Sequence, residues 1–227
     1  MSDGFVLQEP QQEQPQEDSK QLNFISREHM LFATPFWQTK VEGVDNEPIK
    51  KYCYELRDKT KGVVISNRGG WHSGEILNPI PNELQNFFNQ VQVWANNYCA
   101  QITGITDLVI GNWWVNINPP KSLHVKHCHP NCDIAGVLWI KIPENSGKLL
   151  FVSPYNYMCY NEMMCYSKEF RDNHAYHFDY AYTATEGGLM LFPAHLEHKV
   201  LENKSDEDRI SVSFNLNLIN NDTEVEI

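Results

Sequence analysis

The sequence has no hydrophobic run as long as the roughly 18 to 20 residues of a membrane-spanning helix, and its opening, MSDGFVLQEP, lacks the charged-then-apolar pattern of an export signal. It also has no cluster of lysine and arginine. Basic residues number 18 against 29 acidic ones, so the formal net charge is -11, and such a chain repels the phosphate backbone of nucleic acids. These absences predict a cytoplasmic protein with neither a membrane nor a nucleic-acid partner.

A disulfide-rich scaffold is excluded as well, because the chain is long, has few cysteines and lacks an export signal. We expect the cysteines to be reduced thiols, each interpreted first as a small buried hydrophobic residue. The six are Cys53, Cys99, Cys128, Cys132, Cys159 and Cys165.

The chain does contain enough hydrophobic material for a core, since 41% of its 227 residues are hydrophobic and 12% are aromatic. Residues 1–22, dominated by Gln, Glu and Pro, are predicted to be a disordered tail. Residues 23–227 are expected to form one domain, with a first strand at 31–37. Residues 154–182, rich in tyrosine and methionine, are interpreted as an insertion that is either a lid over a substrate or an ordinary packed excursion.

Hydrophobic spacing predicts two packing helices in the first half of the chain. One begins at Asp45 or Asn46 and has apolar residues at helical spacing, namely Ile49, Tyr52, Cys53 and Leu56. The other spans residues 81–102, with one apolar face made of Leu84, Phe87, Phe88, Val91, Trp94, Ala95 and Tyr98. Between the helices, SNRGGWHSG at residues 66–74 is predicted to be a loop that exposes His72.

After residue 105 the pattern changes to short segments rich in β-branched and aromatic residues, each bounded by turn residues. They are TDLVIGNWWVNINPP, IAGVLWIKIP, GKLLFVSP, GGLMLFP, HKVLE and RISVSFNLNLI. No helical pattern intervenes, which favours antiparallel pairing. The sequence therefore predicts a mainly β fold of six to eight strands, arranged as a sandwich or a barrel.

Histidine is concentrated in the segment HVKHCHPNC. Along a strand, side chains two residues apart share a face, so His127 and His129 are expected to point the same way and His124 the other way. Imidazole is the commonest neutral metal ligand, and an H-x-H pair can hold a metal with two nitrogen atoms. A third ligand is expected from FPAHLEHKV, which contains His195 and His198.

The strand that begins at His198 is followed by the acidic turn ENKSDED and then by RISVSFN. A hairpin is expected to bring Arg209 back alongside this strand. Arg209, Ser211 and Ser213 share one face of the returning strand. An arginine and a serine that face inward near a metal can grip a carboxylate.

These segments, in their order, resemble a 2-oxoglutarate/Fe(II) oxygenase family whose members share an H-x-H-P motif and an F-P-x-x-L-x-H then R-I-S-x-S-F-N ending. The matching segments are LFATPFW, SNRGGWHS, WVNIN, HCHPNCDIAGVLWIKIP, SGKLLFVSP, GGLMLFPAHLEHKV and RISVSFN. The resemblance covers most of the chain, from residue 31 to residue 218. It implies a double-stranded β-helix, a cupin-like jelly roll that uses Fe(II), 2-oxoglutarate and O2.

By motif, the resemblance implies that Arg209 grips the distal carboxylate of 2-oxoglutarate, with Ser211 beside it. Trp139 stands where the family often has a tyrosine that bonds the cosubstrate, and its indole N–H can donate a hydrogen bond. Asn116 and Asn118 either line the same pocket or are ordinary polar residues at the end of a strand. The implied iron ligands, which are also catalytic, are His127, His129 and His198.

The implied activity is that of a dioxygenase that hydroxylates a C–H bond of a peptide, an amino acid or a small metabolite and releases succinate and CO2. The sequence is compatible with a homodimer. Asp133 stays open as an alternative ligand to His129. Two other classes also stay open. One is a non-catalytic cupin-like metal-binding module in which Arg209 pairs with an acid of ENKSDED. The other is a structural zinc site made from His124, Cys128 and Cys132, with a fourth ligand from the downstream histidines.

Overall fold

The computed structural model describes residues 34–42, 45–76, 80–104, 107–154 and 165–219. The predicted tail at residues 1–22 lies outside the described residues, as does part of the predicted insertion. The first strand of the described residues, β1, is Trp37–Lys40. The prediction of a strand at 31–37 is therefore wrong for residues 34–36, which precede β1. Pro35 explains the late start, because it has no N–H to donate to a sheet.

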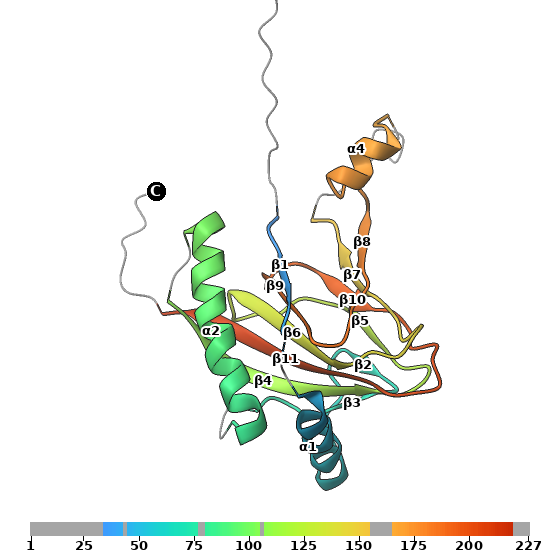
Figure 1. Cartoon of the computed structure of the whole chain (residues 1–227). Helices are drawn as coiled ribbons and strands as arrows, with labels where there is room; N and C mark the ends of the chain where they lie inside the picture. Colours follow the sequence, from blue (N-terminus) through green and yellow to red (C-terminus); the bar gives the residue numbers. More distant parts are fainter. Residues whose placement is uncertain (1–33, 43–44, 77–79, 105–106, 155–164, 220–227) are drawn as a thin grey trace, which may run out of the picture. The chain divides into compact units, whose positions relative to one another are not determined.

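The strands of the described chain form two antiparallel sheets (Figure 1). The larger has the order β1-β9-β6-β11-β4-β3, and the smaller has the order β2-β5-β10-β7-β8. The mainly β prediction is confirmed. The strands of the larger sheet after β1 are β9 (Gly188–Pro193), β6 (Ile134–Lys141), β11 (Arg209–Leu218), β4 (Leu108–Asn118) and β3 (Trp71–His72). Those of the smaller are β2 (Asn67–Arg68), β5 (Leu123–His127), β10 (His198–Val200), β7 (Leu149–Val152) and β8 (Asp179–Tyr182).

Both predicted helices form, and they pack against the larger sheet (Figure 1). Helix α1 is Asn46–Lys59, and the Asp45 side chain caps it by accepting a hydrogen bond from the backbone N–H of Glu47. Helix α2 is Asn82–Thr103. The buried helix residues join the sheet in one hydrophobic cluster: Ile49, Cys53, Leu84, Phe87, Phe88, Val91, Ala95 and Cys99.

One residue of the predicted α2 face is placed differently. Tyr98 is 50% exposed, whereas the neighbouring Cys99 is fully buried. The buried stripe follows the helical repeat from Ala95 to Cys99, four residues on, which leaves Tyr98 at its edge. The Tyr98 ring packs there on Trp94, with 5.6 Å between ring centroids.

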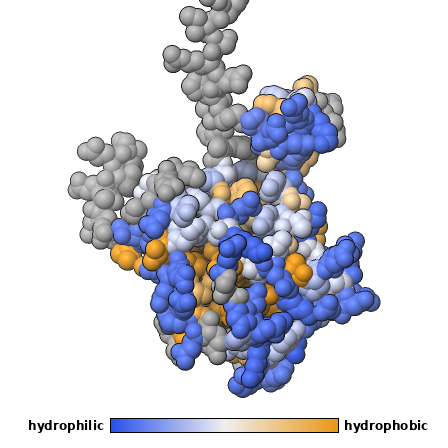
Figure 2. Space-filling model, in the orientation of Figure 1, coloured by the Kyte–Doolittle hydropathy of each residue, from blue (hydrophilic) through white to orange (hydrophobic). Residues whose placement is uncertain are grey.

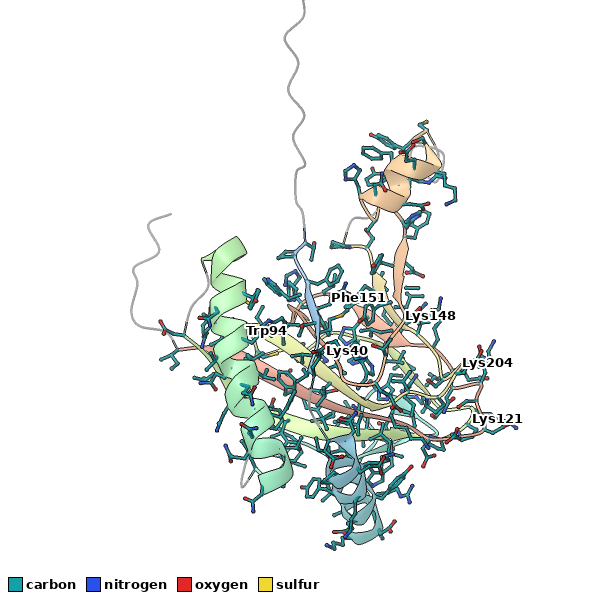
Figure 3. The ribbon with its side chains drawn as sticks, in the orientation of Figure 1. Lys40, Trp94, Lys121, Lys148, Phe151 and Lys204 are labelled. Atoms are coloured by element: carbon teal, nitrogen blue, oxygen red, sulfur yellow. The ribbon has the colours of Figure 1, made fainter. Side chains whose placement is uncertain are left out.

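A second, smaller hydrophobic cluster lies between the two sheets. Phe151 of β7, labelled in Figure 3, packs edge-on against Phe192 of β9 with 5.0 Å between ring centroids. The larger sheet is therefore covered by helices on one side and by the smaller sheet on the other.

The predicted hairpin between the strands at His198 and Arg209 does not form. β10 pairs with β5 and β7, whereas β11 pairs with β4 and β6 in the other sheet. The connection crosses from sheet to sheet and is held by buried Asn203, whose Nδ2 donates to the carbonyl oxygen of Asn118 at 2.8 Å. Loops carrying Lys121, Lys148 and Lys204 meet at this end of the sheets (Figure 3).

The described part of the predicted insertion contains helix α4 (Lys168–Asn173), which Ser167 caps, followed by β8. No residue of α4 is buried, and Figure 2 shows a mainly hydrophilic surface there. Residues 155–164 lie outside the described residues, so the lid role stays a prediction. None of the helices in the described part of the chain combines the length and the hydrophobicity that a bilayer span requires.

Candidate active site

Three histidines from two distant segments of the chain come together between the sheets. His127 ends β5, His129 lies in the turn that follows, and His198 begins β10 opposite His127. The ring centroid of His198 lies 4.4 Å from that of His127 and 5.1 Å from that of His129. The potential ligand atoms of the three side chains all lie within 4.8 Å of one another. His195, the other downstream candidate, is exposed.

Each of the three rings is oriented by a hydrogen bond at Nδ1. In His127 and His198, Nδ1 donates to the carbonyl oxygen two residues earlier, at 2.7 and 2.8 Å. In His129, Nδ1 donates to Oδ1 of Asn215 at 2.8 Å. An acceptor at Nδ1 holds the proton there and leaves the Nε2 lone pair for a metal.

Burial keeps these imidazoles neutral. Burial, assisted by the neighbouring His127, lowers the pKa of His198 from 6.5 to about 3. Burial also lowers the pKa of His127 and of His129. Because a metal binds the neutral ring, the three histidines need not lose protons before an ion binds at neutral pH.

Asp133, the alternative to His129, is turned away from this cluster. It is exposed, and its Oδ2 accepts a hydrogen bond from the backbone N–H of Leu218 at 2.7 Å. The turn after β5 has Asn131 in a left-handed conformation, with φ 65°. The backbone N–H of His129 donates to the carbonyl oxygen of Ala194 at 2.9 Å. The turn therefore ties the His129 backbone to the end of β9 and Asp133 to the end of β11.

The prediction that His124 points away from His127 is wrong, because both side chains line one cavity. In the pairing of β10 with β5, His198 lies opposite His127 and Val200 lies opposite His124. The pairing therefore advances by three residues along β5 and by two along β10, so β5 contains one extra residue. This irregularity is a β-bulge. A bulge shifts the alternation of a strand by one residue, which turns His124 inward.

His124 nevertheless stays outside the metal-binding group. Its Nδ1 lies 3.0 Å from Ser66 Oγ and its Nε2 lies 3.1 Å from Asn118 Nδ2. Across the ranges that the structure describes, no group with metal-ligand spacing includes His124, Cys128 or Cys132. The structure therefore gives no support to the predicted zinc site.

The cavity has a volume of about 340 Å³ and runs between the two sheets. Alternate, mostly polar side chains of β4 and β11 line it: Asn112, Trp114, Asn116, Asn118, Arg209, Ser211, Ser213 and Asn215. The strand register places Arg209 opposite Asn118 at one end and Asn215 opposite Asn112 at the other. We call these the Arg209 end and the Asn112 end of the cavity.

Arg209 is a buried charge without an acidic partner among the described residues. It is 3% exposed, and its Nη1 donates to the carbonyl oxygen of Ser146 at 2.5 Å. Its Nη2 is buried and has no hydrogen-bond partner among the described residues, and burial lowers its pKa to about 10. The predicted pairing with an acid of the 202–208 turn is absent from the ion pairs of the described chain. A buried guanidinium in this state has the right donors for an anionic ligand.

Three further residues that were predicted to contact the cosubstrate follow Arg209 along the cavity. Ser211 pairs with Asn116 on β4 and with Trp139 on β6, and all three are buried and line the cavity. Nδ2 of Asn116 donates to Ser213 Oγ at 3.2 Å, while its Oδ1 is buried without a partner in the described chain. The structure therefore brings all the predicted cosubstrate residues to one cavity.

His72 is a cavity residue that the sequence analysis placed wrongly. It is 5% exposed and belongs to β3, which pairs with β4 so that His72 lies opposite Asn116. Its ring stacks on Trp114, with 5.8 Å between centroids. The glycines before it suggested a loop, but pairing with β4 buries alternate side chains of the short strand.

The sequence analysis also missed Asn112, Trp114 and Asn215. The alternation that marked Asn116 and Ser211 continues along β4 and β11 to these residues. Following that alternation to the strand ends would have found them. Glu75, which also lines the cavity, follows β3 and had no comparable signal.

The comparisons with known proteins agree with this geometry. The model of the family described as "Putative 2OG-Fe(II) oxygenase" matches residues 112–215, a range that contains the three histidines and Arg209. The matched residues are similar to this oxygenase family and make up just under half of the chain. The match identifies an enzyme that uses Fe(II), 2-oxoglutarate and O2. No curated protein is similar enough in sequence to count as a match.

Solved structures of 2-oxoglutarate oxygenases share the fold. A Pseudomonas putida prolyl-4-hydroxylase is 12% identical over 82% of this chain and 94% of that one, with a TM-score of 0.58. SnoN, an alpha ketoglutarate dependent epimerase from nogalamycin biosynthesis, is 10% identical over 82% and 78%, with a TM-score of 0.56. HygX from Streptomyces hygroscopicus, with nickel, 2-oxoglutarate and hygromycin B bound, is 10% identical over 82% and 84%, with a TM-score of 0.51. The predicted jelly roll is confirmed.

Proposed function

We propose that this oxygenase hydroxylates a C–H bond of an organic substrate, with His127, His129 and His198 as the iron ligands and Arg209 as the residue that holds 2-oxoglutarate. The substrate class is a peptide, an amino acid or a small metabolite. The observation that carries the proposal is the buried Nη2 of Arg209, which has no hydrogen-bond partner in the described part of the chain. It lies in the same cavity as three imidazoles with their Nε2 atoms available.

The charges of the site fit this assignment. Three imidazoles contribute no negative charge, whereas the commoner triad of two histidines and a carboxylate contributes one. The dianion of 2-oxoglutarate supplies negative charge to the ion at one end of the molecule and to Arg209 at the other. Ser211, Asn116 and Trp139 lie between these two positive groups and offer hydrogen-bond donors to the cosubstrate.

The chain's own residues bind, orient and shield the reactants. Arg209 fixes the distal carboxylate, so the keto acid end of 2-oxoglutarate is directed toward the histidines. The hydrophobic cluster between the sheets, with Phe151 and Phe192, limits access of water from that side. With iron bound, the cofactors supply the oxidation in which R–H, 2-oxoglutarate and O2 yield R–OH, succinate and CO2.

The direct test is turnover of 2-oxoglutarate by anaerobically purified protein that is loaded with Fe(II) and then exposed to O2. We expect succinate to form, with one atom of labelled O2 in succinate and the other in the hydroxylated product once a substrate is supplied. Release of no succinate by iron-loaded protein would contradict the proposal.

The ligand assignment is tested by replacing each downstream histidine in turn. His198→Ala is expected to lose bound iron, because two imidazoles remain where three are needed. His195→Ala is the matched control and should retain iron, since His195 is exposed and outside the cluster. Metal content after dialysis measures both variants, and stoichiometric iron in His198→Ala would overturn the assignment.

A further inference from the structure

The Asn112 end of the cavity contains features that the binding of iron and 2-oxoglutarate does not use. Glu75 is the one carboxylate among the described residues that line the cavity. It is exposed and takes part in none of the ion pairs of the described chain. The strand register puts this end opposite to Arg209, the other formal charge of the lining.

Hydrogen bonds hold Glu75 in place. Its Oε1 accepts a hydrogen bond from Nδ2 of Asn112. The next residue, Ile76, forms a β-bridge with Trp113, which fixes the backbone beside β4. Glu75 is therefore a positioned carboxylate at the cavity and not a free surface side chain.

The remaining hydrogen-bond capacity at this end includes acceptors on Asn112 and Glu75. Nδ2 of Asn112 is engaged by Glu75, and Oδ1 of Asn112 is buried without a partner in the described structure. The carboxylate of Glu75 keeps further lone pairs. A ligand that covers these groups must donate several hydrogen bonds, because an unpaired carboxylate or amide oxygen is costly to bury.

This end also lies next to the predicted iron ligands. Asn112 is opposite Asn215 in the strand register, and Oδ1 of Asn215 accepts the hydrogen bond from His129. The Trp114 ring lies 5.4 Å from the His129 ring, centroid to centroid. A group held by Glu75 is thus placed close to the reacting centre and beside an aromatic surface.

We propose that the Asn112 end is the substrate subsite and that Glu75 selects a substrate carrying a primary ammonium or guanidinium group. Such cations have several N–H donors and no acceptor, which matches the acceptors that are left here. The net charge of -11 also favours the approach of a cation. This inference rests on the proposed function, since it places the substrate beside the proposed iron ligands.

The test uses protein with Mn(II) in place of Fe(II) and with 2-oxoglutarate added, so that no turnover occurs. The probes are free L-lysine, N-acetyl-L-lysine N-methylamide and the neutral N-acetyl-L-norleucine N-methylamide. Mn(II) speeds the nuclear relaxation of protons on any probe that binds nearby, and Zn(II) protein is the diamagnetic reference. We expect a lysine probe to bind about tenfold more tightly than norleucine, in line with the strength of a charge-assisted hydrogen bond.

Variants identify the residue responsible. Glu75→Gln removes the charge but keeps an oxygen for Asn112, and it should weaken binding of the lysine probes about tenfold. Glu144→Gln is the matched control, because Glu144 is exposed and does not line the cavity. Equal affinity for lysine and norleucine probes, or wild-type affinity in Glu75→Gln, would overturn the inference. Preference for free lysine supports an amino-acid or other small-molecule source, and preference for the blocked lysine supports a peptide side chain.

The same samples separate this inference from the proposed function. Relaxation of the 2-oxoglutarate protons by Mn(II) reports cosubstrate beside the metal. If these protons are unaffected, the proposed function fails. If they relax faster and the cationic probes show no preference, the cation subsite alone fails.

Discussion

At the scale of single residues, the state of Arg209 is the most informative feature of the molecule. A guanidinium that is 3% exposed normally has a carboxylate near it, since the cost of burying an isolated charge is large. Here the described chain provides backbone carbonyl oxygens and leaves Nη2 unpaired. A ligand carboxylate would complete this arrangement, which makes the role of Arg209 directly testable.

Arg209→Ala is expected to weaken 2-oxoglutarate binding by at least about 30-fold, the usual loss when one partner of a buried charge pair is removed. Metal binding should be unchanged, because Arg209 is not part of the histidine group. Isothermal titration with Zn(II)-loaded protein measures the cosubstrate, and metal analysis measures the ion. Arg209→Lys keeps the charge and should recover part of the affinity. Wild-type affinity in Arg209→Ala would assign the carboxylate grip elsewhere.

At the scale of elements, the pairing of β6 with β11 depends on a glycine. Gly136 of β6 lies opposite Phe214 of β11. A Cβ added at Gly136 would meet two ring carbons of Phe214 at 2.3 Å and the Leu191 side chain at 2.9 Å. Contact this close forces the ring or the strand to move. The glycine therefore lets a large aromatic side chain pack under β6 in the helix-covered core.

Gly136→Ala is expected to lower the free energy of unfolding by about 1 to 3 kcal/mol, the usual cost of overpacking a core. Urea unfolding of the metal-free protein measures the loss. In a chain that already carries Phe214→Leu, Gly136→Ala should lower the free energy of unfolding by less than it does in the parent chain, because the smaller side chain leaves room for the added methyl group. Equal losses from Gly136→Ala in both backgrounds would mean that the Phe214 ring is not the cause.

The two faces of β4 and β11 also separate stability from chemistry at this scale. Buried apolar residues such as Val115, Ile117, Val212 and Phe214 face the helices. The intervening polar residues face the cavity. A change on the first face should act through folding, whereas a change on the second should act through ligand binding.

At the scale of the whole molecule, the fold buries several imidazoles around one cavity. Burial is the largest cause of the lowered pKa of His72, to about 4, and of His124 and His198, each to about 3. In the unfolded chain these groups regain a pKa near 6.5, so the unfolded state binds more protons below that pH. The contribution of these neutral histidines to the free energy of unfolding is therefore complete above pH 6.5 and is lost as the pH falls from 6.5 toward 3.

This linkage predicts that the free energy of unfolding of the metal-free protein decreases between pH 6.5 and pH 4, with each neutral histidine contributing a slope of up to about 1.4 kcal/mol per pH unit. Urea unfolding at several pH values measures it. His124→Gln, which removes one titrating ring outside the metal group, should reduce the slope by about one such contribution. An unchanged slope in His124→Gln would show that His124 does not contribute.

Local patterns in the sequence predicted much of this molecule. The apolar spacing of α1 and α2 and the alternation of β4 and β11 are visible in the sequence, because the periods of helix and strand are properties of consecutive residues. The H-x-H-P segment and the R-I-S-x-S-F-N ending also marked the histidines and Arg209 that now lie at one cavity. These predictions depended on residues near one another in the chain or on ordered motifs.

Long-range pairing decided what the sequence could not. The bulge between His127 and His124, the crossing of the chain from β10 to β11 between two sheets, and the burial of His72 all depend on which distant strand lies alongside. Glu75 reached the cavity in the same way, through the bridge of Ile76 to Trp113. The local sequence of a strand shows which side chains share a face. The free energy of packing against distant strands determines whether that face points into the core, into the cavity or to solvent.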